Sequence, residues 1–268
     1  ESAFEDCFGL ASVTLGNSVT SIGTNAFFHC FGLTNVTMGS NVTSIESGAF
    51  GGCSSLPGVM IANSVTNIGS DAFFYCLGLT NVTMGSNVTS IGSDAFNYCR
   101  SLTNIVIPDR VTSIGANAFL YCFEMTSATI GSGVTDIGDH AFSSCSRLAS
   151  VVFKGNAPSS GDHVFDFSPS VIVYYLPGTT GWGGTYGGVP ARLWDAQIAR
   201  DGNLRAQADG FSFNLTASAD VPVVVEASAD FTNWTPVFSG SVINGSMYFE
   251  DGQSTNYPSR YYRIRMPY

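Results

Sequence analysis

The segment LTNVTMGSNVTSI fills residues 33–45 and recurs without a change at residues 79–91. Two steps of 23 residues separate the copies, and the same step connects all seven cysteines of the chain. It also connects a series of phenylalanines and a series of isoleucines. A fixed period of roughly 20 to 50 residues is typical of a solenoid, in which each repeat forms one coil. The sequence therefore predicts a stack of coils in one register.

The phenylalanine and cysteine positions form the predicted core of this stack. A regular repeat returns each position to the same face of every coil, so that like residues line up in columns. No single coil can bury its own apolar face, but neighbouring coils cover each other. The predicted core columns are Phe27, Cys30, Phe50, Cys53, Phe73, Cys76, Phe96, Cys99, Phe119, Cys122, Phe142 and Cys145.

One repeat, residues 88–110, divides into three pieces. Residues 88–91 alternate with period two, which predicts a short strand. Residues 93–99 place apolar side chains at the spacing of one helical turn, with Ser93 as its N-cap. Residues 102–107 alternate again and predict a second strand, before a proline turns the chain towards the next coil.

The unit VTSIGxxAFxxCxxLTxVxxG resembles the BspA-type leucine-rich repeats of bacterial and protist surface proteins. The resemblance covers residues 1–154, which we expect to form seven coils. It implies an extracellular or cell-surface location and a role in adhesion or protein binding. It implies neither an enzyme nor any catalytic residue.

The repeat phase continues beyond the seven coils in a degenerate form. Phe165 extends the phenylalanine column, and Ser168 stands where the next cysteine is expected. Residues 155–194 are therefore predicted to form a degenerate eighth coil and a C-terminal cap, which hides the last open face of the solenoid. The polar residues 195–209 are predicted to be a linker.

The remaining residues, 210–268, predict a small β-sandwich module. The strings VVVEASADFTNW and SRYYRIRMP resemble modules found at the C-terminal ends of large secreted bacterial proteins. The expected fold class is thus a leucine-rich-repeat solenoid, β-rich with short helical turns and a 23-residue period, followed by a small all-β sandwich-like domain. The expected strands are residues 210–217, 221–228, 234–239, 246–250 and 260–266.

Composition narrows the range of partners. The formal net charge is −10 and Lys154 is the single lysine, so a polyanion would be repelled and nucleic acid is not expected as a partner. The sequence has no run of about 18 to 20 apolar residues, the length that a membrane-spanning helix needs, so insertion into a membrane is not expected. The paired carboxylates, histidine spacings and phosphate-binding loops of common enzymes are not recognisable either, and we expect no cofactor.

The seven thiols allow three interpretations. Stacked coils would place their Cβ atoms near 4.8 Å with parallel side chains, whereas a disulfide favours about 3.8 Å and converging side chains. No column of histidines accompanies the thiols to complete a metal site. Buried free thiols that act as small hydrophobes are therefore the preferred interpretation. Disulfides and a metal site stay open as alternatives.

Large side chains stand beside the buried Phe and Cys where the family usually has small ones. Three coils read AFFHCFGL, AFFYCLGL and AFLYCFEM. Because the first Phe and the Cys point inwards, their large neighbours are expected to line up as an apolar, tyrosine-rich stripe, of the kind that interfaces favour. An alternative is that the C-terminal region of the same chain covers the stripe. The candidate interface residues are Phe28, His29, Phe31, Phe74, Tyr75, Leu77, Tyr98, Leu120, Tyr121 and Phe123.

These observations together favour a structural or adhesive protein of the bacterial surface that self-associates, with assembly into a filament as one form. Its expected partner is protein, namely other copies of itself, through the stripe and the uncapped first coil. The alternative is a monomeric adhesin module that binds a host or neighbouring-cell protein on its strand face. An ice-binding or carbohydrate-associated module is a third, less favoured interpretation.

Overall fold

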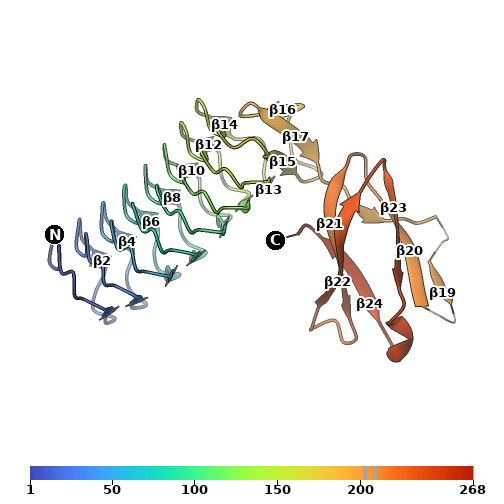
Figure 1. Ribbon diagram of the computed structural model, residues 1–268, viewed down its shortest axis with the longest axis horizontal. Coiled ribbons are helices and arrows are strands. Elements are labelled where there is room, and N and C mark those ends of the chain that lie inside the picture. The colour runs from blue at the N-terminus through green and yellow to red at the C-terminus, as the bar shows by residue number, and fades with distance from the viewer. Residues whose placement is uncertain (202–203, 208–209, 268) are drawn as a thin grey trace. The chain divides into compact units, whose positions relative to one another are not determined.

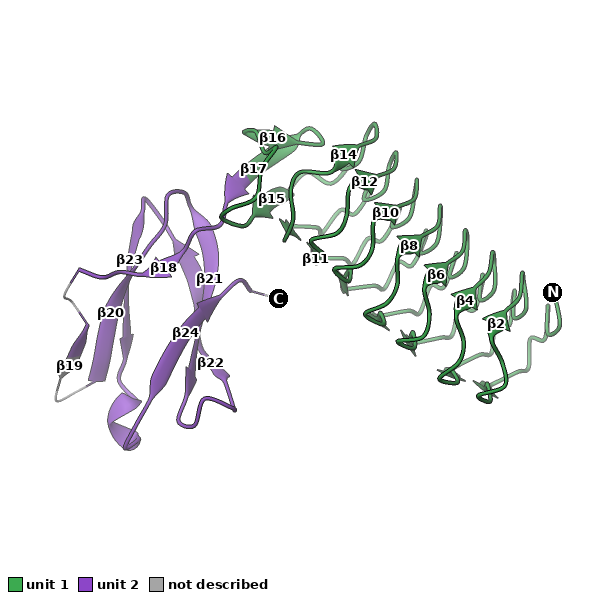
Figure 2. Cartoon of the chain, turned by 180° about the vertical axis from the view of Figure 1, so that it is seen from behind, with its two compact units in different colours: residues 1–191 green, residues 192–268 purple. Residues whose placement is uncertain are grey.

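The computed structural model describes residues 1–201, 204–207 and 210–267. The chain divides into two compact units, Glu1–Ala191 and Arg192–Tyr268 (Figure 2). Unit 1 is a β-solenoid and unit 2 is an antiparallel β domain, as the sequence predicted (Figure 1). The fold class is therefore confirmed.

One side of the solenoid is a seven-stranded parallel sheet of very short strands. Each strand pairs with the residues 23 positions further along the chain, for example Ile91 with Ile114. The isoleucine of each full coil points inwards and is buried. In chain order the strands are β2 (Ser21–Ile22), β4 (Ser44–Ile45), β6 (Asn67–Ile68), β8 (Ser90–Ile91), β10 (Ser113–Ile114), β12 (Asp136–Ile137) and β14 (Ser159–Ser160).

A second column of strands forms another side of each coil. The pairs β1–β3 and β5–β7 are followed by a six-stranded sheet in the order β9, β11, β13, β15, β17, β16. The strands are β1 (Ser12–Thr14), β3 (Asn35–Thr37), β5 (Gly58–Met60), β7 (Asn81–Thr83), β9 (Asn104–Val106), β11 (Ser127–Ile130), β13 (Ser150–Phe153), β15 (Ile172–Tyr175), β16 (Thr185–Tyr186) and β17 (Val189–Leu193).

The third side of each coil contains turns where the sequence predicted a helical turn. The N–H of Phe96 donates to the carbonyl of Ala118 in the next coil at 2.8 Å, while the N–H of Cys99 closes a turn onto Phe96 O at 3.2 Å. Alternate N–H groups along this side thus bond between coils, which an α-helix cannot do because its bonds run within one segment. The expected helical turn is corrected to a β-turn ladder.

The phenylalanine column runs through the centre of unit 1. Consecutive rings from Phe27 to Phe142 stack with centroids 5.1–5.4 Å apart, and the twelve predicted core residues are at most 3% exposed. Phe165 continues the column at 5.9 Å from Phe142 and is buried. Beyond it, Trp182 and Tyr186 pack against Phe153 with centroids 5.0 and 5.2 Å away. An aromatic cluster therefore closes this end of the core.

Unit 2 is built from two antiparallel sheets. One has β18 (Gln197–Ile198), β20 (Gly210–Thr216) and β19 (Arg205–Gln207), with β23 (Ser246–Asp251) also paired to β20; the other has β22 (Thr235–Val242), β21 (Val221–Ser228) and β24 (Tyr261–Arg265). A 3₁₀ helix, Ser254–Asn256, precedes β24. Phe213 on β20 packs 5.5 Å from Tyr262 on β24, so that the two sheets share a core. The five strands expected from the sequence correspond to β20 to β24.

The segment predicted as a linker differs from that expectation. Within residues 195–209, β18 and β19 both pair with β20, so these short strands extend a sheet of unit 2. Residues 202–203 and 208–209 of the same segment lie outside the described residues. These strands were hard to predict because they are only two and three residues long, too short to show an alternation of apolar and polar residues.

Candidate interaction surface

Three tyrosines form a continuous ladder on the turn side of the solenoid. Tyr75, Tyr98 and Tyr121 occupy the same position in successive coils, and we call them the tyrosine ladder. The ring of Tyr98 lies 5.3 Å from that of Tyr75 and 4.5 Å from that of Tyr121. Tyr75 is 40% exposed and the other two are half-buried. The ladder is therefore a surface feature whose members pack on one another.

The backbone at the tyrosine ladder is left-handed. Its φ angles are 58° at Tyr75 and 60° at both Tyr98 and Tyr121. The residue at this position has a positive φ angle in every coil, and in the third coil it is a glycine, Gly52. A residue with a Cβ atom costs roughly 1 to 2 kcal/mol in this conformation, a cost that glycine avoids. Three large aromatic residues thus stand where the turn favours a glycine or an asparagine.

Apolar side chains flank the ladder on both sides. Phe74 meets Tyr98 edge-on at 6.3 Å, and Phe123 lies 5.8 Å from Tyr121. Arg100 places its guanidinium 5.1 Å from the Tyr98 ring and 5.6 Å from the Phe123 ring. The sequence analysis missed Arg100, although its spacing of two residues from Tyr98 was a usable signal. Phe74, Phe123 and Arg100 thus form one patch with the ladder. Leu77 and Leu120, on the same coils as Tyr75 and Tyr121, are also half-buried.

The first part of the predicted stripe is a separate patch. Phe28 lies over the next coil, where a Cβ atom added to Gly51 would come within 2.6 Å of its ring. His29 lies equally close to Gly52, at 2.5 Å, while Phe31 is 43% exposed. Phe28 and His29 thus pack against the small residues of this third coil. These small residues separate the stripe into two patches. The structure does not bring the ten predicted residues together as one surface.

A groove lies on the strand side of the same unit. It has a volume of about 650 Å³ and contains two of the chain's few cations, Arg110 and Lys154. Arg110 donates from Nη1 to Asn87 Oδ1 at 3.2 Å, and Lys154 Nζ lies 3.7 Å from Asp109 Oδ1. Its floor includes Val106, which is 53% exposed on β9. Sequence analysis did not single out this groove because strands and loops of different coils form its walls.

Threonines 23 residues apart directly precede short strands of the seven-stranded sheet, and they have a structural role. Thr89 Oγ1 donates to the carbonyl of Thr66 at 2.9 Å, and the Thr89 N–H donates to the same oxygen at 2.8 Å. The pattern repeats from coil to coil, for example from Thr112 to Thr89 at 3.2 Å. Each hydroxyl hydrogen is therefore engaged between coils, where it satisfies a second lone pair of the carbonyl.

The buried thiols also bond between coils. Cys76 Sγ donates to Phe50 O at 3.2 Å, and the corresponding contacts of the other buried thiols measure 3.1–3.4 Å. Ser168 fills the same position in the eighth coil, with Oγ 3.1 Å from Phe142 O. Burial raises the pKa of Cys53 and of Cys145 to about 12. All seven cysteines are free, and Cys7 alone among them is exposed. The disulfide alternative is therefore wrong.

Across residues 1–201, 204–207 and 210–267, no group of three or more His, Cys, Asp and Glu side chains could hold a metal ion. Within the same part of the chain, no helix has the length and apolar character needed to cross a membrane.

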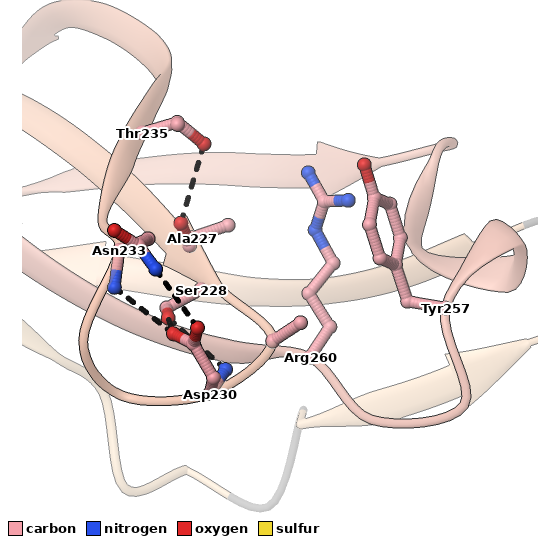
Figure 3. A pocket seen from close by; sticks show the side chains of 8 residues that line it. Ala227, Ser228, Asp230, Asn233, Thr235, Tyr257 and Arg260 are labelled. Atoms are coloured by element: carbon pink, nitrogen blue, oxygen red, sulfur yellow. Dashed lines mark hydrogen bonds between the residues drawn. The ribbon is translucent and has the colours of Figure 1, made fainter.

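Unit 2 has a pocket that the sequence analysis did not foresee (Figure 3). It has a volume of about 200 Å³ and lies between the end of β21, the loop after it and the segment before β24. The loop is organised by Asp230, whose Oδ1 accepts the N–H groups of Thr232 and Asn233 at 2.8 and 2.9 Å. These bonds hold the pKa of Asp230 well below its usual range. Tyr257 and Arg260 form the opposite wall.

Comparison with solved structures finds bacterial leucine-rich-repeat proteins. A T. pallidum leucine-rich-repeat protein is 30% identical over 63% of this chain and 69% of its own, with a TM-score of 0.46. A protein from Bacteroides ovatus is 20% identical over 72% of this chain, with a TM-score of 0.48. The present chain spans 63% of the length of the B. ovatus protein. No curated protein matches the chain.

The repeat itself identifies the family. The pattern described as the BspA type leucine-rich repeat region matches residues 1–99 and 66–180, with six copies. The matched residues span the coils whose phenylalanine and cysteine columns form the core. The resemblance drawn from the repeat sequence is thereby confirmed, and the chain belongs to the BspA-type leucine-rich-repeat family.

Proposed function

We propose that this chain is a non-enzymatic extracellular protein that acts through protein–protein contacts and associates with other copies of itself along the tyrosine ladder. Membership of the BspA-type family supports a surface location and a binding role. Contact of the tyrosine ladder with the same ladder of a second molecule would close a two-fold dimer, and assembly into a filament would need a further contact between different surfaces of two molecules.

The left-handed backbone of the tyrosine ladder is the observation that carries the proposal. Strained residues with bulky side chains persist where the side chain contributes something that glycine cannot. Within the monomer, Tyr75 gains only partial burial and ring contacts with its neighbours. The position therefore favours a second role for the aromatic side chains, and a protein interface is the environment in which exposed tyrosines contribute most.

The energy available from the patch supports association. The ladder and its flanking residues are half-exposed, so that a partner can still remove much of their apolar area from water at about 25 cal/mol per Å². Tyrosine loses little side-chain entropy on binding, and its hydroxyl can remain hydrogen-bonded at the rim. Arg100 adds a cation that is already held over two rings. Aromatic residues and arginine are the types that dominate interface energies.

The strand-side groove supports a second candidate, a monomeric adhesin that binds a foreign protein there. Met60 is 70% exposed and Val106 is 53% exposed at the same position of this face, two coils apart with Thr83 between them. The groove next to Val106 also offers the cations Arg110 and Lys154 to an acidic partner. This face and the tyrosine ladder are made by different segments of each coil, so that variants can separate the two candidates.

Light scattering coupled to size-exclusion chromatography tests the proposal over a concentration series up to tens of micromolar. The variant Phe74→Ser with Phe123→Ser removes two flanking aromatics that are only half-buried in the monomer. We expect wild-type protein to shift to larger species with rising concentration and this variant to remain monomeric. Phe28 was also predicted to lie at the interface, but it stays unchanged in this variant because it packs against Gly51 within the monomer.

The matched control is Met60→Ser with Val106→Ser, which removes two exposed apolar side chains from the strand side. This control should associate like the wild type. Wild-type protein that stays monomeric at every concentration contradicts self-association. Dispersal by the control and not by the aromatic variant would favour the strand side as the contact surface.

A further inference from the structure

A second pocket adjoins the one described in unit 2. It has a volume of about 220 Å³, and Tyr257 and Arg260 belong to its wall as well as to the wall of the first pocket. Two pockets of similar size thus lie on either side of one tyrosine–arginine pair. Each is smaller than the roughly 300 to 1,000 Å³ of a typical drug-sized site, and the two together reach that range.

Arg260 is an unusual wall residue. Its side chain is only 10% exposed, and its guanidinium lies 4.1 Å from the centre of the Tyr257 ring. Nε lies 2.8 Å from Asp251 Oδ2, yet it makes no hydrogen bond of acceptable geometry within the described residues. A buried arginine normally spends its five N–H donors on acceptors. Here Nε is buried against Asp251, and the two Nη groups are the donors that a ligand in the pockets could reach.

The charges around the pair disfavour an ionic ligand. Asp230 and Asp251 carry negative charges beside the positive charge of Arg260, in a chain whose formal net charge is −10. An anion would therefore be repelled, and a cation would meet the guanidinium on the face of Tyr257. A neutral ligand avoids both costs.

The remaining wall residues favour a ligand rich in hydroxyl groups. Asn233 donates its amide hydrogens to Asp230 Oδ2 and Thr232 Oγ1, at 2.9 and 3.1 Å, and its Oδ1 faces no donor among the described residues. Serine and threonine side chains line both pockets. Phe211 and Tyr262, which stack at 5.1 Å, add an aromatic wall to the second pocket. Flat apolar faces beside available donors and acceptors match a sugar ring, which has apolar C–H faces and a rim of hydroxyl groups.

We propose that these paired pockets bind a neutral glycan, with one sugar unit on each side of Tyr257 and Arg260. The aromatic faces contact the C–H faces of the sugars, while Arg260 and Asn233 bond to their hydroxyl oxygens and hydrogens. This binding does not depend on the tyrosine ladder of unit 1. It would give the chain a glycan-binding site in addition to its protein contacts.

An array of immobilised neutral glycans, probed with the full chain, tests the proposal. Its glycans should cover plant, bacterial and mucin-type structures, and the shortest that binds is then titrated by calorimetry. Tyr257→Ala should weaken binding by about tenfold or more, because it removes an aromatic wall shared by both pockets. Ser259→Trp should block the second pocket from an exposed position, and it serves as an independent variant if Tyr257→Ala proves unstable.

The control is Tyr248→Ala, which removes a tyrosine of β23 that is 58% exposed and lines neither pocket. It should bind as the wild type does. The proposal is overturned if no neutral glycan binds, if only charged glycans bind, or if Tyr257→Ala and Ser259→Trp both retain wild-type affinity.

Discussion

The thiol of Cys99 donates a hydrogen bond to the carbonyl oxygen of Phe73 in the preceding coil, at 3.3 Å. The same contact recurs along the solenoid, so that each buried cysteine is both a small core residue and a donor between coils. This relationship explains why Ser168 can continue the column, since its hydroxyl donates to Phe142 O at 3.1 Å. It also explains why thiols persist here without pairing into disulfides.

Reaction with a thiol reagent follows directly from this arrangement. In native protein Cys7 is exposed while the other six cysteines are buried, so a single rapid equivalent is expected. After denaturation all seven should react. A colorimetric thiol assay with and without denaturant measures both values. If several thiols of the native protein reacted rapidly, the cysteines of the core column would not be buried as described.

Alkaline pH should destabilise the fold through the same residues. Burial raises the pKa of Cys53 from 9.0 to about 12, and that of Cys145 likewise. Between these values the unfolded chain loses the thiol proton while the folded chain retains it. The free energy of unfolding should then fall as pH rises above 9.0, by up to about 1.4 kcal/mol per pH unit for each such thiol.

Urea unfolding between pH 8 and pH 11 measures this slope. The double variant Cys53→Ala with Cys145→Ala should be less stable at neutral pH but should show a shallower decline, because two titrating groups are gone. An equal decline in the variant and the wild type would assign the alkaline effect to other groups, such as the tyrosines.

The sequence predicted the columns of the solenoid but not the geometry of its turns. Phe96 and Cys99 stand three residues apart, a spacing that fits a helical turn and a β-turn equally well. The available signal was the position occupied by Asp71, Asp94 and Asn117, since aspartate and asparagine are enriched where φ is positive. Intercoil hydrogen bonds decide between the two, and they appear only once coils are stacked.

The two candidate sites differ in how far the sequence could lead. The tyrosine ladder follows from the repeat, because residues 23 apart share a face. The stripe is divided at Gly51 because the Phe28 side chain lies over the next coil. The 23-residue period does not predict this side-chain position. The first pocket of unit 2 combines Asn233, in the loop after β21, with Arg260, in the segment before β24, and only the pairing of β21 with β24 brings these two segments together.

Close stacking of the coils makes certain glycines irreplaceable. A Cβ atom at Gly92 would lie 2.5 Å from the backbone of Gly69 and Ser70, which cannot move without separating the coils. Gly92→Ala should therefore lower the free energy of unfolding by about 3 kcal/mol. Gly58→Ala is the control, because its nearest neighbour would be 3.4 Å away. Denaturant titration should show a near-neutral control, and equal effects would contradict this account of coil packing.

The tyrosine ladder predicts an unusual effect on monomer stability. Asparagine tolerates the left-handed conformation better than tyrosine, so Tyr98→Asn relieves strain of roughly 1 kcal/mol while losing ring contacts of similar value. The free energy of unfolding at submicromolar concentration should change by less than about 1 kcal/mol. If the free energy of unfolding fell by 3 kcal/mol or more, Tyr98 would be a core residue whose role in the monomer alone explains its presence.

Sedimentation equilibrium of the triple variant Tyr75→Asn, Tyr98→Asn and Tyr121→Asn measures whether copies of the chain associate through the tyrosine ladder. We expect wild-type protein to form oligomers at tens of micromolar, and the folded triple variant to sediment as a monomer of about 28.2 kDa at the same concentration. Oligomers of unchanged affinity in the triple variant would contradict the claim that the tyrosine ladder is the contact surface.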